Sequence, residues 1–247
     1  MKKEKAFTLA EVLITLGIIG IVAAMTLPTL VAKHRKKVLH TQFLKAYSDI
    51  QNAAKRLQAD EGITVYELSQ KDLNYSTDTL KVLMGYFIGQ KNGGLVSSSY
   101  DPDTGENISY ENAIGYIPKN LANKVVTTQP CDRSIFSEEV GGRFWAMDDP
   151  VSKYDDPPYG PKICVDTNGR KGPNIYGYDW FVFVFTKDGG VKPYIGSSYA
   201  TISNETPYPE RACSYTSANV TYTCAYFAVT DTSPEDPSKS YWTDFLK

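Results

Sequence analysis

The sequence contains only two histidines and no Cys-x-x-Cys pair, so it lacks the ligand spacing that structural zinc sites use. It also lacks a phosphate-binding glycine loop, a Gly-x-Ser-x-Gly turn and a His-Glu-x-x-His helix. The formal net charge is only -2, which gives no indication of a nucleic-acid partner. These absences predict a protein that is not an enzyme, holds no resident cofactor and binds no nucleic acid.

Four cysteines are present, and all of them follow the apolar N-terminal segment. An even number in this position predicts two disulfides formed in an oxidising compartment. Four cysteines allow three connectivities; we favour a short loop closed by Cys213 and Cys224, with Cys131 and Cys164 paired across the sheet. The alternative, four reduced thiols in a cytosolic protein, is disfavoured because the N-terminal segment independently indicates export.

A long apolar run follows the charged hexapeptide MKKEKA and extends from Phe7 to Val31, with Glu11 as its only charge. As a helix, this run spans roughly 37 Å, which exceeds the bilayer core of about 30 Å. A secretory signal peptide would have a shorter apolar core. A plain membrane anchor fits the length but leaves Glu11 unexplained, because an unpaired carboxylate in lipid costs at least about 2.5 kcal/mol.

The string KAFTLAEVLITLGIIGIVAAMTLPTL resembles the prepilin signal shared by type IV pilins and type II secretion pseudopilins. The resemblance implies that a prepilin peptidase cuts after Ala6 and that the new first residue, Phe7, is N-methylated. It places Glu11 fifth and Pro28 twenty-second in the mature chain, where this family commonly has Glu and Pro. Ala6 departs from the usual Gly before the cut, which implies slower cleavage rather than none.

The same resemblance implies a function and a set of partners. It implies a filament subunit that works with other pilin or pseudopilin subunits, the prepilin peptidase/methyltransferase, an inner-membrane assembly platform and membrane lipid. The freed amine of one subunit would pair with Glu11 of a neighbour, which would fix the register of the two. The chain would cross the inner membrane once, with its globular domain outside the cytoplasm, and then enter a pilus or a periplasmic or extracellular filament. The alternative is a minor tip pilin or an anchored adhesin whose tyrosine-rich loops bind a ligand, since the sequence has 18 Tyr.

Basic residues occur on both sides of the apolar run, so the positive-inside rule gives no orientation. The cluster at 33–37 has the composition of a DNA or anionic-lipid contact, but we favour a solvated turn of helix beside the headgroups.

Apolar residues continue at helical spacing from Leu39 to Leu57, and Gly62 is a candidate C-cap. We therefore expect a leader at 1–6 and one helix at 7–60, whose part 7–31 lies in the membrane or the filament core. A globular β-rich domain at 61–247 follows. The expected fold class is α+β, a long N-terminal helix packed on an antiparallel sheet, as in pilins.

Strands are expected at 143–147, 162–166, 179–186 and 191–195, with a hairpin turn at 187–190. The apolar content of 180–185 indicates a strand buried on both faces. Residues 63–125 are ambiguous, although 79–88 has the character of a short helix or strand. The tail, which includes Tyr241, Trp242 and Phe245, is expected to dock on the domain as a short aromatic segment.

Two loops are weak candidates for calcium. The stretch around Asp166, Asn168 and Asp179 resembles a glycine-rich loop of pilin-like proteins, where these three side chains would meet around a cation; we favour Asx-turn hydrogen bonds instead. Residues 101–111 match a calcium loop only loosely, and we favour an ordinary turn there.

Overall fold

A computed structural model describes residues 8–71, 77–87, 95–98, 110–126, 130–131, 135–139, 141–147, 159–195, 213–216 and 223–247. The chain forms two units, Met1–Val38 and Leu39–Lys247. One helix, α1 (Leu9–Glu61), contributes to both units, and its bounds agree with the helix expected at 7–60.

The fold is α+β, as expected. The other helical elements among the described residues are α2 (Val65–Gln70), α3 (Thr77–Met84), α4 (Tyr110–Ile114), the 3-10 turn η1 (Gly169–Lys171), α5 (Cys224–Thr230) and the π-helical turn η4 (Tyr241–Phe245). The strands are β1 (Leu95–Ser98), β2 (Ile135–Glu138), β3 (Phe144–Met147), β4 (Tyr159–Asp166), β5 (Trp180–Thr186) and β6 (Val191–Pro193).

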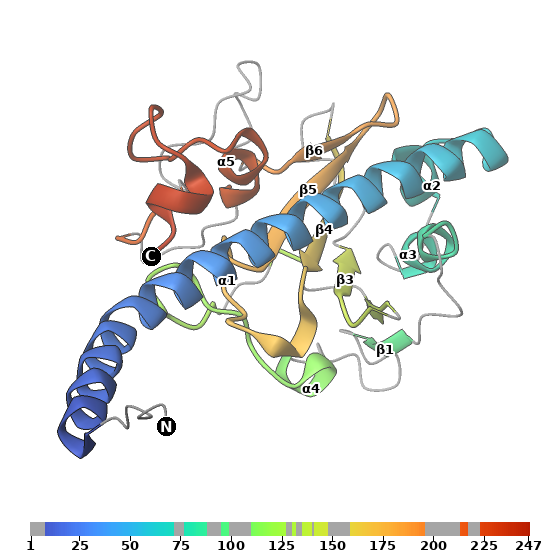
Figure 1. Ribbon diagram of the computed structural model, residues 1–247. Coiled ribbons are helices and arrows are strands. Elements are labelled where there is room, and N and C mark those ends of the chain that lie inside the picture. Colours follow the sequence, from blue (N-terminus) through green and yellow to red (C-terminus); the bar gives the residue numbers. More distant parts are fainter. Residues whose placement is uncertain are drawn as a thin grey trace, which may run out of the picture. The chain divides into compact units, whose positions relative to one another are not determined.

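The six strands of the described residues form one sheet in chain order, β1 to β6, and every neighbouring pair is antiparallel (Figure 1). The four strands predicted from the sequence are β3 to β6, and the predicted turn at 187–190 joins the last two. Strands β1 and β2 were not predicted. In the described parts of the ambiguous region at 63–125, the chain forms the short helices α2, α3 and α4 and the strand β1.

From Leu39 onward, α1 runs across one face of the sheet (Figure 1). Its ring contacts centre on Phe43, whose ring centroid lies 4.4 Å from that of Phe181 and 6.0 Å from that of Phe183 on β5. The buried residues of α1 are Leu39, Phe43, Ala46, Ile50, Ala53, Ala54 and Leu57. The stripe predicted from helical spacing is therefore the face that covers the sheet.

A second apolar layer covers the opposite face of the sheet. Side chains of a strand alternate between its two faces, so β5 directs Phe181 toward α1 and Val182 into this second layer. The layer includes Tyr110 and Ile114 of α4 together with Cys131. Every residue of β5 is buried, which confirms the prediction of a strand covered on both faces.

The ends of the helices follow from local sequence. Gly62 adopts φ +70° directly after α1 and donates its N–H to the Gln58 carbonyl at 3.1 Å, so it is the C-cap that the sequence predicted. Thr64 and Glu67 then form a capping box that starts α2.

The C-terminal aromatic segment docks on the domain, as predicted. Trp242 is buried and donates its Nε1–H to the Ala228 carbonyl at 3.0 Å. Its ring stacks on His40 of α1 with a centroid distance of 4.8 Å. This contact could not be predicted, because 202 positions of chain separate the two rings and no local pattern connects them.

Candidate functional site

The first unit of the chain presents an apolar surface. Large exposed apolar side chains surround this part of α1, namely Leu9, Val12, Leu13, Ile14, Leu16, Ile18, Ile19, Ile21, Val22, Met25, Leu27, Leu30 and Val31. Among the described residues, α1 is the helix that is long and apolar enough to cross a membrane. N-terminal signal sequences also meet these criteria of length and composition. We call residues Leu9–Val31 the apolar segment. So much apolar area is unfavourable in water, and this part of α1 therefore fits a helix that is embedded in a membrane.

Glu11 closes a capping box at the start of α1. Thr8 donates from its backbone N and from its Oγ1 to Glu11 Oε2, both at 2.8 Å. Glu11 N donates in return to Thr8 Oγ1 at 3.2 Å. Glu11 was predicted to act in assembly, and this local role was not predicted, although the Thr-x-x-Glu spacing is the ordinary signature of a capping box.

The other polar groups of the apolar segment are largely satisfied within the helix. Thr15 Oγ1 donates to the Val12 carbonyl and Thr26 Oγ1 to the Val22 carbonyl, both at 2.9 Å. Such internal bonds are what a helix needs in lipid, where no water replaces them. Pro28 lies inside α1 and has no N–H to donate along the helix. The predicted cleavage and methylation residues, Ala6 and Phe7, lie outside the described residues.

Comparison with known families identifies the N-terminal segment. Residues 1–27 match the prokaryotic N-terminal methylation motif, which is the prepilin-type signal of type IV pilins and pseudopilins. The match supports a processed, pilin-like subunit and ends before the globular domain. No curated protein and no solved structure gives a significant match to the chain.

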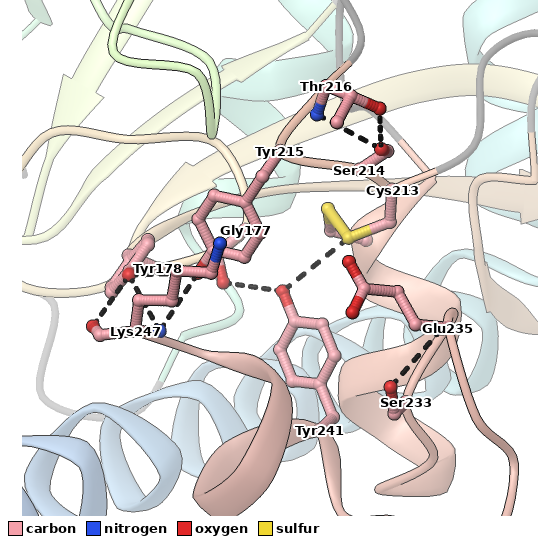
Figure 2. The surroundings of a disulfide bond; sticks show 11 residues. Gly177, Tyr178, Cys213, Ser214, Tyr215, Thr216, Ser233, Glu235, Tyr241 and Lys247 are labelled. Carbon is pink, nitrogen blue, oxygen red and sulfur yellow. Dashed lines mark hydrogen bonds between the residues drawn. A yellow bond between two sulfur atoms is a disulfide. The ribbon is translucent and has the colours of Figure 1, made fainter.

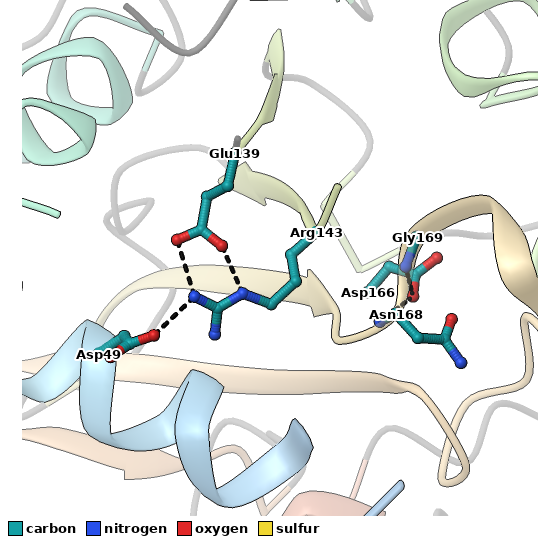
Figure 3. A network of polar contacts seen from close by, with 6 residues as sticks. All are labelled: Asp49, Glu139, Arg143, Asp166, Asn168 and Gly169. Atoms are coloured by element: carbon teal, nitrogen blue, oxygen red, sulfur yellow. Dashed lines mark hydrogen bonds and ion pairs between the residues drawn. The ribbon is translucent and has the colours of Figure 1, made fainter. Parts of the chain in front are cut away.

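A charged network connects the second part of α1 to the sheet (Figure 3). Arg143 forms a bidentate pair with Glu139, and its Nη2 also donates to Asp49 Oδ2 of α1 at 2.6 Å. Burial raises the pKa of Glu139, and the Arg143 guanidinium opposes that rise. Glu139 and Arg143, which we call the inner pair, are nearly buried, whereas Asp49 is about a third exposed. Removing one member of the inner pair is therefore more costly than removing Asp49, because it leaves a buried charge unpaired.

Both disulfides favoured by the sequence analysis are present, Cys131–Cys164 and Cys213–Cys224. Figure 2 shows the second one beside Tyr241, whose hydroxyl lies 3.9 Å from Cys213 Sγ and donates to the Gly177 carbonyl at 2.6 Å. Gly177 has φ +97°, and a Cβ there would come within 2.9 Å of Cys224 Sγ. The C-terminal part of the domain is thus closely packed against the loop that precedes β5.

The candidate calcium residues lie in the loop between β4 and β5. Asp166 is fully buried, and its Oδ1 accepts from the backbone N of Asn168 at 3.1 Å and of Gly169 at 2.9 Å. Its Oδ2 accepts from the Tyr116 hydroxyl. Figure 3 shows the Asp166 carboxylate turned toward this backbone. These contacts form the Asx turn that the sequence analysis favoured.

Asp179 supports the other end of the same loop. Its Oδ2 accepts from Asn174 N at 2.8 Å and its Oδ1 from Ile175 N at 2.7 Å. Burial raises the pKa of Asp179 to about 6, while the two backbone donors oppose that rise. Burial, followed by the nearby charge of Asp179, also raises the pKa of Asp166. Among the described residues, no group of three or more His, Cys, Asp or Glu side chains is placed to hold a metal ion.

The described tyrosines serve mainly as packing residues. Every tyrosine whose burial the structure describes is buried or half-buried, including Tyr110 and Tyr176 in the second layer. Tyr75, Tyr100, Tyr154, Tyr199, Tyr208 and Tyr222 lie outside the described residues, as does the candidate calcium loop at 101–109.

Proposed function

We propose that this chain is a structural subunit, a pilin or pseudopilin, of a type IV pilus or a type II secretion-like filament. In this proposal, prepilin peptidase cuts the precursor after Ala6 and methylates the new N-terminus at Phe7. An inner-membrane assembly platform then moves the subunit from the bilayer into the filament. The globular domain lies outside the cytoplasm throughout, where the two disulfides are stable.

The observation that carries the proposal is that the exposed apolar segment Leu9–Val31 overlaps the methylation motif, which matches residues 1–27. A soluble protein would bury this surface or lose it by cleavage. A subunit that leaves the membrane for a helical bundle keeps the surface covered in both places, first by lipid and then by neighbouring helices.

Glu11 gives this bundle a means of fixing register. Its two bonds from Thr8 both use Oε2, and among the described residues no group donates to Oε1. The amine freed at Phe7 of a neighbouring subunit would supply a cation for this carboxylate. Once desolvated, a charge pair is costly to break, so subunits out of register are disfavoured.

The alternative function, a minor tip pilin or anchored adhesin, uses the same apolar segment and differs in its globular domain. The described tyrosines do not form an exposed patch, so no observation favours this alternative over a structural subunit. Stoichiometry separates the two: a tip subunit is present in few copies per filament, whereas a major pilin is present along its length.

Mass spectrometry of the mature N-terminus tests the proposal directly. We expect the chain isolated from its native membrane to begin with N-methylated Phe7, and deletion of the prepilin peptidase gene to restore Met1. A mature chain that begins near Met25 would indicate an ordinary secreted protein. A chain that keeps its leader when the peptidase is present would indicate a plain membrane anchor.

A further inference from the structure

Five consecutive residues follow the apolar segment of α1 after Ala32, and we call them the basic collar: Lys33, His34, Arg35, Lys36 and Lys37. All of them are helical, and all are exposed except Lys36, which is half-buried. No Asp or Glu occurs between Glu11 and Asp49, so this stretch of α1 is uniformly basic.

Helix geometry distributes the collar around the whole circumference of α1. Five successive residues exceed the 3.6 of one turn, so the basic side chains point in every direction rather than along one stripe. A one-sided protein partner would contact only part of such a collar. A ring of lipid headgroups around the helix reaches its exposed members from every side.

The height of the collar also matches a lipid surface. It extends over about 6 Å along the helix axis, and each headgroup layer of a bilayer is about 5–8 Å thick. The apolar segment is long enough to fill the hydrocarbon core, so the collar lies at headgroup level on the side toward the globular domain. Arg35 and the lysines are suited to phosphate, Arg35 by bidentate hydrogen bonds and the lysines by charge.

We infer that the basic collar binds the phosphate groups of anionic phospholipids, such as phosphatidylglycerol, in the outer leaflet of the membrane that holds the subunit before assembly. This inference rests on the proposed function, because it requires the apolar segment to lie in a bilayer. Cleavage after Ala6 removes the three leader lysines, so the collar becomes the main positive charge flanking the span. Binding of anionic lipid there would retain the subunit at a fixed depth until extraction.

Native mass spectrometry of the mature full-length protein tests the inference, using detergent micelles that contain equal amounts of phosphatidylglycerol and phosphatidylcholine. The test variant changes four collar residues to Gln: K33Q, R35Q, K36Q and K37Q. The control makes the same change of net charge at exposed lysines elsewhere: K45Q, K55Q, K124Q and K171Q. Each basic residue near an anionic surface favours association by about fivefold. We therefore expect at least about fivefold more phosphatidylglycerol than phosphatidylcholine on the wild type and the control, and no preference on the test variant.

The inference would be overturned by equal retention of both lipids by the wild type, by an unchanged preference in the test variant, or by an equal loss in the control. Displacement of the lipid by excess soluble glycerol phosphate would also overturn it, since the collar would then bind free phosphate rather than a lipid surface. Resistance of the wild type to carbonate extraction is measured in parallel. If the protein is extracted, the proposed function fails; if it stays in the membrane without lipid preference, only the collar inference fails.

Discussion

Arg143 Nη2 donates a hydrogen bond of 2.6 Å to Asp49 Oδ2, across 94 positions of the chain. This contact joins α1 to the β2–β3 turn, and Arg143 also holds the buried carboxylate of Glu139. The arginine therefore serves two carboxylates that differ in exposure, and changes at the three residues should have unequal effects on stability.

Arg143→Met should lower the free energy of unfolding by about 3–5 kcal/mol, because it leaves Glu139 buried without a cation. Asp49→Asn keeps the inner pair intact and should cost about 1 kcal/mol or less, since Asp49 is partly exposed. Urea unfolding of the full chain in detergent, followed by circular dichroism, measures both values. Equal losses for the two variants would show that the inner pair has no special importance.

The disulfide pair gives a second stability comparison. In the chain-entropy account, the Cys213–Cys224 bridge, with a separation of 11, contributes about 3 kcal/mol, and Cys131–Cys164, with a separation of 33, contributes about 4 kcal/mol. Replacing either pair by Ala should reduce stability by these amounts, as measured by urea unfolding without reductant. Non-reducing peptide mapping should recover the same two pairings, and a peptide that links Cys131 to Cys213 would contradict them.

Sequence patterns predicted the elements whose signal is local. The spacing of Leu39 to Leu57 predicted the packed face of α1, and the apolar run at 180–185 predicted β5. Strand β2 was missed because Ser137 and Glu138 interrupt any apolar pattern, and its pairing with β3 decides its conformation. Such short elements are determined by tertiary contacts rather than by propensity.

In the candidate site, too, local features could be predicted from the sequence and contacts between distant residues could not. The register of Glu11 and Pro28 was visible in the sequence, and so was the Thr8 capping pattern that went unnoticed. The Asp49–Arg143 contact was not predictable, because no spacing rule relates residues 94 positions apart. The same holds for the stacking of His40 on Trp242.

Acid should stabilise the β4–β5 loop. The pKa of Asp179 is raised to about 6 in the fold, above its ordinary value of 3.8, so the folded state binds more protons than the unfolded state between these values. Stability from this group is therefore fully present below about pH 4 and is lost as the pH rises through about 6. The raised pKa of Asp166 acts in the same direction. The melting temperature of the full chain in detergent should therefore fall as the pH rises from 4 to 6.5. A melting temperature that rises over this range would contradict the prediction.

Two substitutions assign the pH effect to this loop. Asp166→Asn keeps an oxygen for Asn168 N and Gly169 N, and its amide can donate to the Tyr116 hydroxyl, so it should flatten the pH profile at little cost. In Asp179→Asn, the amide NH₂ group replaces one of the two oxygens that accept from Asn174 N and Ile175 N, so one backbone donor loses its acceptor. This variant should lose about 1–3 kcal/mol of stability at every pH. The same measurement with millimolar calcium tests whether this loop, a weak calcium candidate in the sequence, binds a cation. A higher melting temperature in wild type that is absent in both variants would support a bound cation.

The two roles of Glu11, capping and assembly, can be separated by substitution. Glu11→Gln keeps an oxygen that accepts from Thr8, so the capping box survives while the charge is lost. Thr8→Val removes the hydroxyl and keeps the carboxylate, at a cost to the helix start of about 1 kcal/mol. Glu61→Gln, at the far end of α1, is the control for loss of one negative charge.

If Glu11 pairs with the amine of a neighbouring subunit, Glu11→Gln should lower incorporation into filaments far more than Thr8→Val does. Loss of a desolvated pair costs about 3 kcal/mol, which is roughly a hundredfold in subunit affinity. Quantitative immunoblots of sheared filaments measure incorporation, and carbonate extraction verifies that each variant still inserts in the membrane. If Thr8→Val abolishes incorporation while Glu11→Gln assembles normally, the carboxylate acts only as a cap, and register must be fixed by the shape of the apolar segment instead.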